Sequence, residues 1–157
     1  MTGSENAAGR PPDAVDREWE VTWGDCDPAG IVYNPRYLEW FTLGRITYLR
    51  KWGVPYGEAF RAAGVEAVVY EAHLRILRPS RPEDRVLIRT WIAELSRSRL
   101  RFSYQVLDPD GQVLAEGYTT HAYVDASGRP FDLAKRAPAL WERLSRLPVS
   151  PPVTTLK

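Results

Sequence analysis

The 157-residue sequence has one cysteine, two histidines and no long apolar run. The single cysteine, Cys26, excludes an intrachain disulfide, and together with two histidines it lacks the number and spacing of zinc ligands. No apolar stretch approaches the roughly 20 residues of a membrane-spanning helix, and the N-terminal segment lacks the apolar core of a signal peptide. We therefore expect a soluble, cytoplasmic protein.

The sequence also lacks an excess of charge of either sign. It holds 21 Lys and Arg against 20 Asp and Glu, a formal net charge of +1, so no overall field attracts nucleic acid or a membrane surface. The length suits one globular domain. We predict this domain at residues 17–147, between disordered tails at 1–16 and 148–157, because both tails are polar and proline-bearing.

An acidic turn leading into a helix is the most informative stretch. Asp25 and Asp27 lie in a turn sequence, and a carboxylate in such a loop is more often held for chemistry than for packing. Asn34 is predicted as the N-cap of the helix, Pro35 as its first residue and Gly53 as its end. The turn thus faces a helix N-terminus, where free N–H groups and the helix dipole favour negative charge.

The body of this helix is apolar nearly all round. Such a pattern indicates a helix enclosed by the fold, and a sheet curled around it is the simplest enclosure in a chain of this size. Gly44 supports this interpretation, since a mid-helix glycine costs about 1 kcal/mol relative to alanine and is expected where a backbone or ligand comes close. The apolar residues are Tyr37, Leu38, Trp40, Phe41, Leu43, Ile46, Tyr48, Leu49 and Trp52.

Strand patterns surround the helix in sequence. The order predicts an α+β fold, an antiparallel sheet of about five strands wrapped around one long central helix. The expected strands are Arg17 to Trp23, Val65 to Leu77, Arg85 to Leu95, Arg99 to Leu107 and Gln112 to Val124, with short helical segments at Pro55 to Ala63 and Pro138 to Leu147.

The run WGDCDPAGIVYNPRY, from Trp23 to Tyr37, is similar to the signature of the 4-hydroxybenzoyl-CoA thioesterase family within the hotdog-fold superfamily. The resemblance extends more loosely to about Asp132. It implies a hotdog fold and hydrolysis of an acyl-CoA thioester to a free acid and CoA, with no metal or redox cofactor. It also implies a homodimer paired through the strand at Val65 to Leu77, assembling into a homotetramer.

The resemblance places the chemistry in the acidic turn. It implies that Asp27 attacks the thioester carbonyl or activates water, and that the backbone N–H of Asn34 serves as the oxyanion hole. Asp25 is expected to shape the turn. Cys26 is expected to be structural, because neither histidine is near it in sequence to act as a base. Glu39, on the central helix, is the fallback base.

Substrate contacts are predicted at two places. Tyr33, Tyr37 and Trp40, with the strand of the partner, would line a tunnel for an aryl or short-chain acyl group, although core packing explains these residues equally well. The resemblance implies that Arg97 and Arg99, in the SRSRLR turn, hold the nucleotide phosphates of CoA, and a rigid guanidinium fork suits phosphate.

Two alternatives stay open at the level of sequence. A hotdog hydratase or dehydratase would use His73, whereas a non-catalytic acyl-CoA-binding module would bind without turnover. His121 carries the weaker signal of the two histidines. The sequence does not determine the acyl group, or whether CoA or an acyl carrier protein carries it. It also does not distinguish a dimer from a tetramer, or a nucleophilic from a general-base mechanism.

Overall fold

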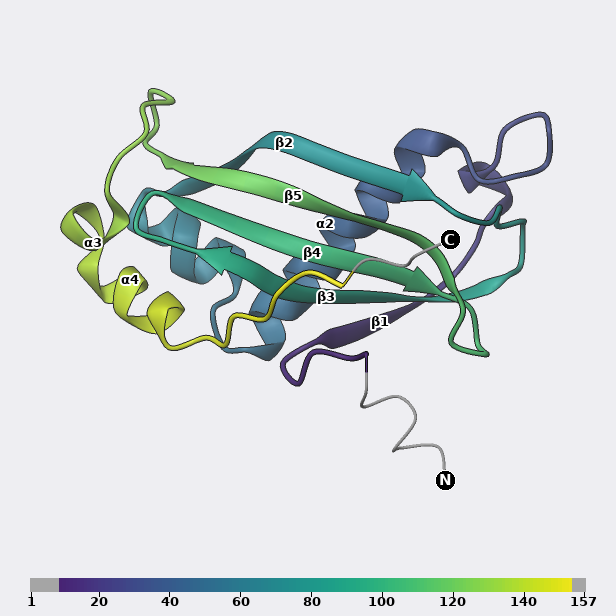
Figure 1. Cartoon of the computed structure of the whole chain (residues 1–157). Coiled ribbons are helices and arrows are strands. Elements are labelled where there is room, and N and C mark those ends of the chain that lie inside the picture. The colour runs from purple at the N-terminus through teal and green to yellow at the C-terminus, as the bar shows by residue number, and fades with distance from the viewer. Residues whose placement is uncertain (1–8, 154–157) are drawn as a thin grey trace.

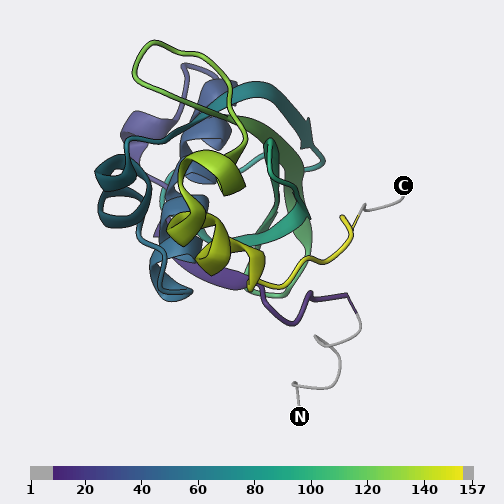
Figure 2. The same cartoon turned by 90° about the vertical axis from the view of Figure 1, so that its left-hand side faces the viewer.

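A computed structural model describes residues 9–153 of the chain. Five antiparallel strands form one sheet in the order β1-β3-β4-β5-β2, and the central helix α2 (Asn34–Lys51) lies against its concave face (Figures 1 and 2). This confirms the predicted α+β hotdog fold. The strands are β1 (Val15–Glu20), β2 (Glu66–Ile76), β3 (Arg85–Leu95), β4 (Arg99–Leu107) and β5 (Val113–Val124).

The inner face of the sheet is apolar because alternate residues of each strand point toward α2. On β4 these are Leu100, Phe102, Tyr104 and Val106, all buried. The ring of Phe41 on α2 stacks on Tyr104, with ring centroids 4.2 Å apart and an interplanar angle of 2°. The aromatic stack therefore joins the middle of the helix to the middle of the sheet.

Two glycines allow helix and sheet to approach closely. A Cβ on Gly44 would lie 2.3 Å from Oγ1 of Thr90 on β3, which confirms the expected close contact. On β5, a Cβ on Gly117 would lie 2.9 Å from the Phe41 ring and 2.0 Å from the His73 carbonyl. A side chain at Gly44 would force α2 away from the sheet, and one at Gly117 would also collide with the backbone of β2.

The helix has one open side, so the prediction of all-round enclosure is wrong. Leu38 is 38% exposed, and Glu39 and Thr42 are also exposed. The edge strand β2 is similarly uncovered, with Val69 43% and Tyr70 54% exposed. A single chain thus leaves apolar surface on both α2 and β2.

The beginning of the chain is more ordered than predicted. The first strand runs from Val15 to Glu20, not from Arg17 to Trp23, and Trp23 lies in a short 3-10 helix, η1 (Trp23–Asp25). Within the tail predicted to be disordered, Asp13 is buried and accepts a hydrogen bond of 3.0 Å from the Tyr48 hydroxyl. Long-range contacts therefore order this segment from residue 9 onward, and residues 1–8 lie outside the described range.

The end of the chain also packs on the domain. After the short helices α3 (Leu133–Arg136) and α4 (Pro138–Ser145), the Ser150 N–H donates to the Ile92 carbonyl at 2.9 Å. The segment passes over the outer face of the sheet (Figure 1), so the order extends beyond the predicted limit of 147. Residues 154–157 lie outside the described range. No helix within residues 9–153 is long and apolar enough to cross a membrane.

The remaining helical elements close the end of the fold near the start of β2. Between α2 and β2, a π-helical turn η2 (Tyr56–Phe60) and a 3-10 turn η3 (Arg61–Ala63) lead to Gly64, whose φ of +74° reverses the chain. This confirms the predicted short helical segment. Gly53, with φ of +78°, ends α2 as predicted.

Candidate active site

Asp27 lies at the start of a tight turn between η1 and α2. Its N–H donates to the Ile31 carbonyl at 2.9 Å, and its carbonyl accepts from Gly30 N–H at 2.9 Å. Its Oδ1 accepts from Ala29 N–H at 2.8 Å, while the side chain remains half-buried. The backbone therefore orients the carboxylate and leaves it reachable from solvent.

Asp25 differs from Asp27 in being buried. Its Oδ2 accepts hydrogen bonds from Trp19 Nε1 at 3.1 Å and from Thr22 N–H at 2.9 Å. Its carbonyl accepts from Tyr33 N–H at 2.8 Å, just before α2. These contacts fix both ends of the turn, in agreement with the shaping role expected for Asp25.

The helix start differs by one residue from the prediction. Tyr33 occupies the N-cap position with extended backbone angles, φ −68° and ψ 130°, and Asn34 is the first helical residue. The cap assigned to the Asn34 side chain is therefore wrong. As first residue of the helix, Asn34 has no intrahelical acceptor for its N–H, so this group is suited to face an anion.

Arg36 connects the helix to the turn, a role that the sequence analysis missed. Its guanidinium donates to the Gly24 carbonyl at 3.2 Å and to Glu39 Oε1 at 2.8 Å, and lies 3.9 Å from Asp25 Oδ1. A basic residue in the first turn of a helix beside an acidic loop was the available signal. The fallback base Glu39 is thus ion-paired and exposed.

Cys26 is not activated as a nucleophile. Burial, followed by the charges of Asp25 and Asp27, raises the pKa of its thiol. Its Sγ lies 3.7 Å from the Thr22 carbonyl. A reactive cysteine needs an electropositive surrounding, so its environment fits the expected structural role.

The three aromatic residues predicted to line a tunnel lie in different environments. Tyr37 and Trp40 are buried in the core, where their rings meet edge to face at 5.0 Å. Tyr33 is 54% exposed and follows the Asp27 turn. Core packing accounts for the first two, whereas Tyr33 is free to contact a ligand.

Of the two predicted phosphate-binding arginines, Arg97 lies in the turn between β3 and β4, and Arg99 is the first residue of β4. Both have acidic neighbours. Arg97 forms a 3.0 Å ion pair with Asp132, and its carbonyl accepts from Leu133 N–H, so it anchors α3. Arg99 is exposed, 3.6 Å from Glu94. Its Nη1 also donates to the Tyr70 hydroxyl at 3.5 Å, and its contacts are longer than the 3.0 Å ion pair of Arg97.

His73 lies on the outer face of the sheet, away from α2. Its ring stacks on Tyr118 of β5 with centroids 5.2 Å apart. It lines a cavity of about 180 Å³ together with Arg75, Arg101 and Val153, the last of the described residues. Its ring contact is with Tyr118, and no hydrogen bond or ring contact among the described residues joins His73 to Asp27.

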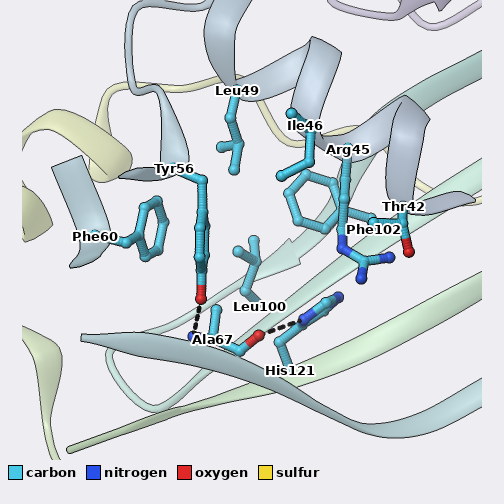
Figure 3. Close-up of a pocket in the computed structure, with 10 residues that line it drawn as sticks. All are labelled: Thr42, Arg45, Ile46, Leu49, Tyr56, Phe60, Ala67, Leu100, Phe102 and His121. Atoms are coloured by element: carbon cyan, nitrogen blue, oxygen red, sulfur yellow. Dashed lines mark hydrogen bonds between the residues drawn. The ribbon is translucent and has the colours of Figure 1, made fainter. Parts of the chain in front are cut away.

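A cavity in the described residues lies between α2 and β2 (Figure 3). Its volume is about 200 Å³. None of the eight residues predicted for the site lines it. Its walls are Thr42, Arg45, Ile46 and Leu49 of α2, Tyr56 and Phe60 of η2, Ala67 of β2, Leu100 and Phe102 of β4, and His121 of β5.

A chain of hydrogen bonds runs behind the cavity. The Ala67 carbonyl can only accept, so His121 Nδ1 donates to it at 3.1 Å, and Nε2 accepts from the Thr119 hydroxyl at 2.8 Å. Thr119 in turn accepts from Tyr104 at 2.6 Å, and Tyr104 accepts from Arg45 at 3.4 Å. Burial lowers the pKa of His121 to about 4, so its ring is neutral at pH 7.

The Asp27 turn and this cavity lie toward opposite ends of β2. The turn contacts the segment after β2, where Val32 N–H donates to the Ser80 carbonyl at 2.9 Å. The cavity lies at the beginning of β2, at Ala67. Arg99 is at the cavity end, because it pairs with Ala122 of β5 beside the start of β2.

Comparisons with known proteins agree with this architecture. A profile of the thioesterase-like superfamily matches residues 21–153. YneP of Bacillus subtilis, named provisionally as an acyl-CoA thioesterase, is 26% identical over 123 residues, 78% of this chain and 88% of YneP.

A second relative and a solved structure extend the likeness. The 1,4-dihydroxy-2-naphthoyl-CoA hydrolase of Thermosynechococcus vestitus is 27% identical over 111 residues, 71% of this chain and 76% of the hydrolase. The structure of a DHNA-CoA thioesterase from Staphylococcus aureus has a TM-score of 0.79 at 22% identity, covering 85% of this chain and 89% of that one. This last comparison shows a shared fold.

Proposed function

The chain belongs to the thioesterase-like superfamily, and on that premise we propose that it is an acyl-CoA thioesterase that releases a free acid and CoA. The observation that carries the proposal is the Asp27 turn, whose carboxylate is oriented by backbone hydrogen bonds directly before the N-terminus of α2. The signature from Trp23 to Tyr37 supports the narrower assignment to the 4-hydroxybenzoyl-CoA thioesterase family.

Asp27 is the nucleophile or the general base of the proposed reaction. A thioester has a good leaving group, so a carboxylate held near its carbonyl can attack it or activate water without a catalytic triad. The half-buried position of Asp27 suits either mechanism, because the carboxylate is fixed and water can reach it.

The Asn34 N–H is the proposed oxyanion donor. Attack on the carbonyl places negative charge on its oxygen, and a donor already aimed at that point contributes a few kcal/mol to lowering the barrier. The helix dipole adds to this effect at the same position. Pro35 cannot donate, which leaves Asn34 as the first available N–H of α2.

The remaining parts of the proposal concern binding. Tyr33 and the exposed Arg99 are the proposed contacts for substrate, with CoA present only as part of substrate and product and no metal or redox cofactor in the chemistry. The assembly is a homodimer through β2, whose exposed edge offers unpaired backbone groups to a second copy. Two such dimers form the proposed homotetramer.

An aryl acyl group is favoured over a long chain. The Thermosynechococcus relative is named for an aromatic CoA ester, and the cavity beside α2 is small. A hydratase reaction at His73 gains no support, since that ring lies on the outer face of the sheet.

The test is release of free CoA from aryl, short-chain and long-chain CoA esters, followed with a thiol reagent. We expect turnover with at least one aryl or short-chain ester. Tight binding of these esters without thiol release would show a binding module instead. Single turnover in heavy-oxygen water would then separate the mechanisms, because label enters Asp27 only if its carboxylate attacks the thioester.

A further inference from the structure

The cavity between α2 and β2 has the size of one ring. Its volume is about 200 Å³, and most of its wall is apolar, from Ile46, Leu49, Phe60, Leu100 and Phe102. A dry cavity of about 150 Å³ with such a lining accepts benzene. The space therefore admits a single aromatic ring with a small substituent.

One side of the cavity is polar because Arg45 lines it. Arg45 is the only lining residue with a permanent charge, and no carboxylate lies within 4 Å of it in the described residues. One of its N–H groups reaches Tyr104, the first member of the chain that ends at Ala67. Figure 3 shows the guanidinium beside the His121 ring at the cavity.

In this series of hydrogen bonds, only Arg45 has N–H groups left to donate to a ligand. His121 donates to Ala67, Thr119 donates to His121 and Tyr104 donates to Thr119, so each of these protons is already used. Arg has five N–H donors in a fixed fork, of which one is used here. Such donors bind hydroxyl and carboxylate oxygens, and most strongly those that carry charge.

We propose that this cavity binds the acyl part of the thioester and that Arg45 selects a ring bearing a hydroxyl or carboxylate group. The inference rests on the thioesterase function proposed above. It makes Arg45 a specificity-determining residue, and it assigns the substrate to the single-ring aryl-CoA esters that carry a hydrogen-bond acceptor.

The cavity serves the catalytic turn of a second copy of the chain. Asn34 and Arg45 are separated by about 16 Å along the axis of α2, at a rise of about 1.5 Å per residue. Within one chain, a single-ring acyl group does not span that distance. In a two-fold dimer, β2 of one copy pairs antiparallel with β2 of the other, so the start of one strand lies beside the end of the other. If the two-fold axis passes through Glu71, the middle of β2, then Ala67 of one copy pairs with residue 75 of the other. The cavity of each chain then faces the Asp27 turn of the other.

The arrangement between two copies is tested with mixed assemblies. Asp27→Asn removes the carboxylate, and Ile46→Trp fills the mouth of the cavity at a half-exposed position. The two variants are co-expressed with different tags, and the hybrid is isolated by both tags and assayed on hydroxybenzoyl-CoA. In the hybrid, the intact Asp27 of one chain meets the intact cavity of the other.

The expected result is recovery in the hybrid to at least about a tenth of wild-type turnover, when each parent variant has under about a hundredth. A hybrid as inactive as its parents would overturn the proposal, as would aryl-CoA hydrolysis by a wild-type monomer. Circular dichroism of each parent variant checks that it is folded. An Ile46→Phe variant, whose side chain fills less of the cavity, should lose less activity than Ile46→Trp.

Selectivity is tested on Arg45 directly. Arg45→Met should lower kcat/KM for hydroxybenzoyl-CoA about 10-fold more than for benzoyl-CoA, and Arg45→Lys should restore part of this preference. Arg50→Met, an exposed position on the same helix, is the matched control and should leave both values unchanged. Equal losses on both esters would refute the role of Arg45. Absence of turnover by wild type on every CoA ester would instead refute the thioesterase function itself.

Discussion

The two ends of α2 differ in what surrounds them. At the N-terminal end, Asp27 and Asn34 are reachable from solvent and are ordered by backbone hydrogen bonds. Toward the C-terminal end, Arg45 and Leu49 line an apolar cavity backed by buried Thr119 and His121. Hydrolysis needs water at the reacting carbonyl, whereas recognition of an acyl group needs surface from which water is excluded. In the proposed reaction, chemistry thus takes place at the N-terminal end of the helix, and the acyl group is recognised near its C-terminal end.

The largest expected effect is the loss of turnover on substitution of Asp27, before the N-terminal end of α2. Asp27→Asn keeps the shape of the turn and removes the charge, so turnover should fall by about three orders of magnitude or more, about 4 kcal/mol in barrier height. Substrate affinity, measured by calorimetry under conditions without turnover, should remain close to wild type. Wild-type-like turnover in this variant would exclude Asp27 from the chemistry.

The second-largest expected effect is the pH dependence of the free energy of unfolding that His121, behind the cavity, causes. The unfolded chain protonates His121 near its ordinary pKa of 6.5, whereas the folded chain does so only near pH 4. Stability from this group is therefore present above pH 6.5 and lost as pH falls toward 4, by about 3 kcal/mol in total.

Urea unfolding at several pH values measures this loss. His121→Gln should flatten the dependence between pH 6.5 and 4, because glutamine does not titrate there. His73→Gln, a change on the outer face of the sheet, is the matched control and should keep the wild-type dependence. Identical profiles for wild type and His121→Gln would show that other groups carry the acid sensitivity.

Backbone donation at the helix start is tested by two substitutions at one position. Asn34→Pro removes the N–H, and turnover should fall about 100-fold, about 2.7 kcal/mol. The extended Tyr33 is compatible with a following proline, so the helix start should persist. Asn34→Ser keeps the N–H and should retain most activity, since the Asn34 side chain is not the cap. Near-normal turnover in a folded Asn34→Pro protein would place the oxyanion elsewhere.

The smallest effect is expected at the exposed Arg99. Arg99→Ala should raise KM for CoA esters about 10-fold, because a charge-assisted bond to phosphate contributes about 1.5 kcal/mol. A truncated thioester without the nucleotide should show little change. Arg97→Ala should act on both substrates equally if its ion pair with Asp132 mainly anchors α3. An equal effect of Arg99→Ala on both thioesters would exclude phosphate binding.

Local patterns predicted most of the fold. The bounds of β3 and β4 agree with the predicted strands, because alternating apolar residues and Pro, Ser, Asp or Gly turns mark them directly in sequence. The ordered N-terminal segment was missed because its order depends on Tyr48 and Trp52, which bind Asp13 from more than 30 residues away. Composition alone does not contain such contacts.

The site was predicted only in part for a similar reason. The acidic turn and helix start are contiguous, so a short motif contains them. The cavity is built from α2, η2, β2, β4 and β5, and no local pattern joins Arg45 to His121. His121 was assigned the weaker role of the two histidines, although it is the buried one, because alternation along β5 does not reveal which hydrogen bonds its ring makes.

A crystal structure of the Asp27→Asn variant with hydroxybenzoyl-CoA tests the proposed site most directly. We predict that the thioester carbonyl lies between residue 27 and the N–H of Asn34 in one chain, with its oxygen about 3 Å from that nitrogen. The ring should occupy the cavity of the second copy, with its hydroxyl on Arg45. A ring bound among Tyr33 and neighbouring residues of the same chain, with the cavity empty, would contradict the separation of chemistry and recognition proposed here.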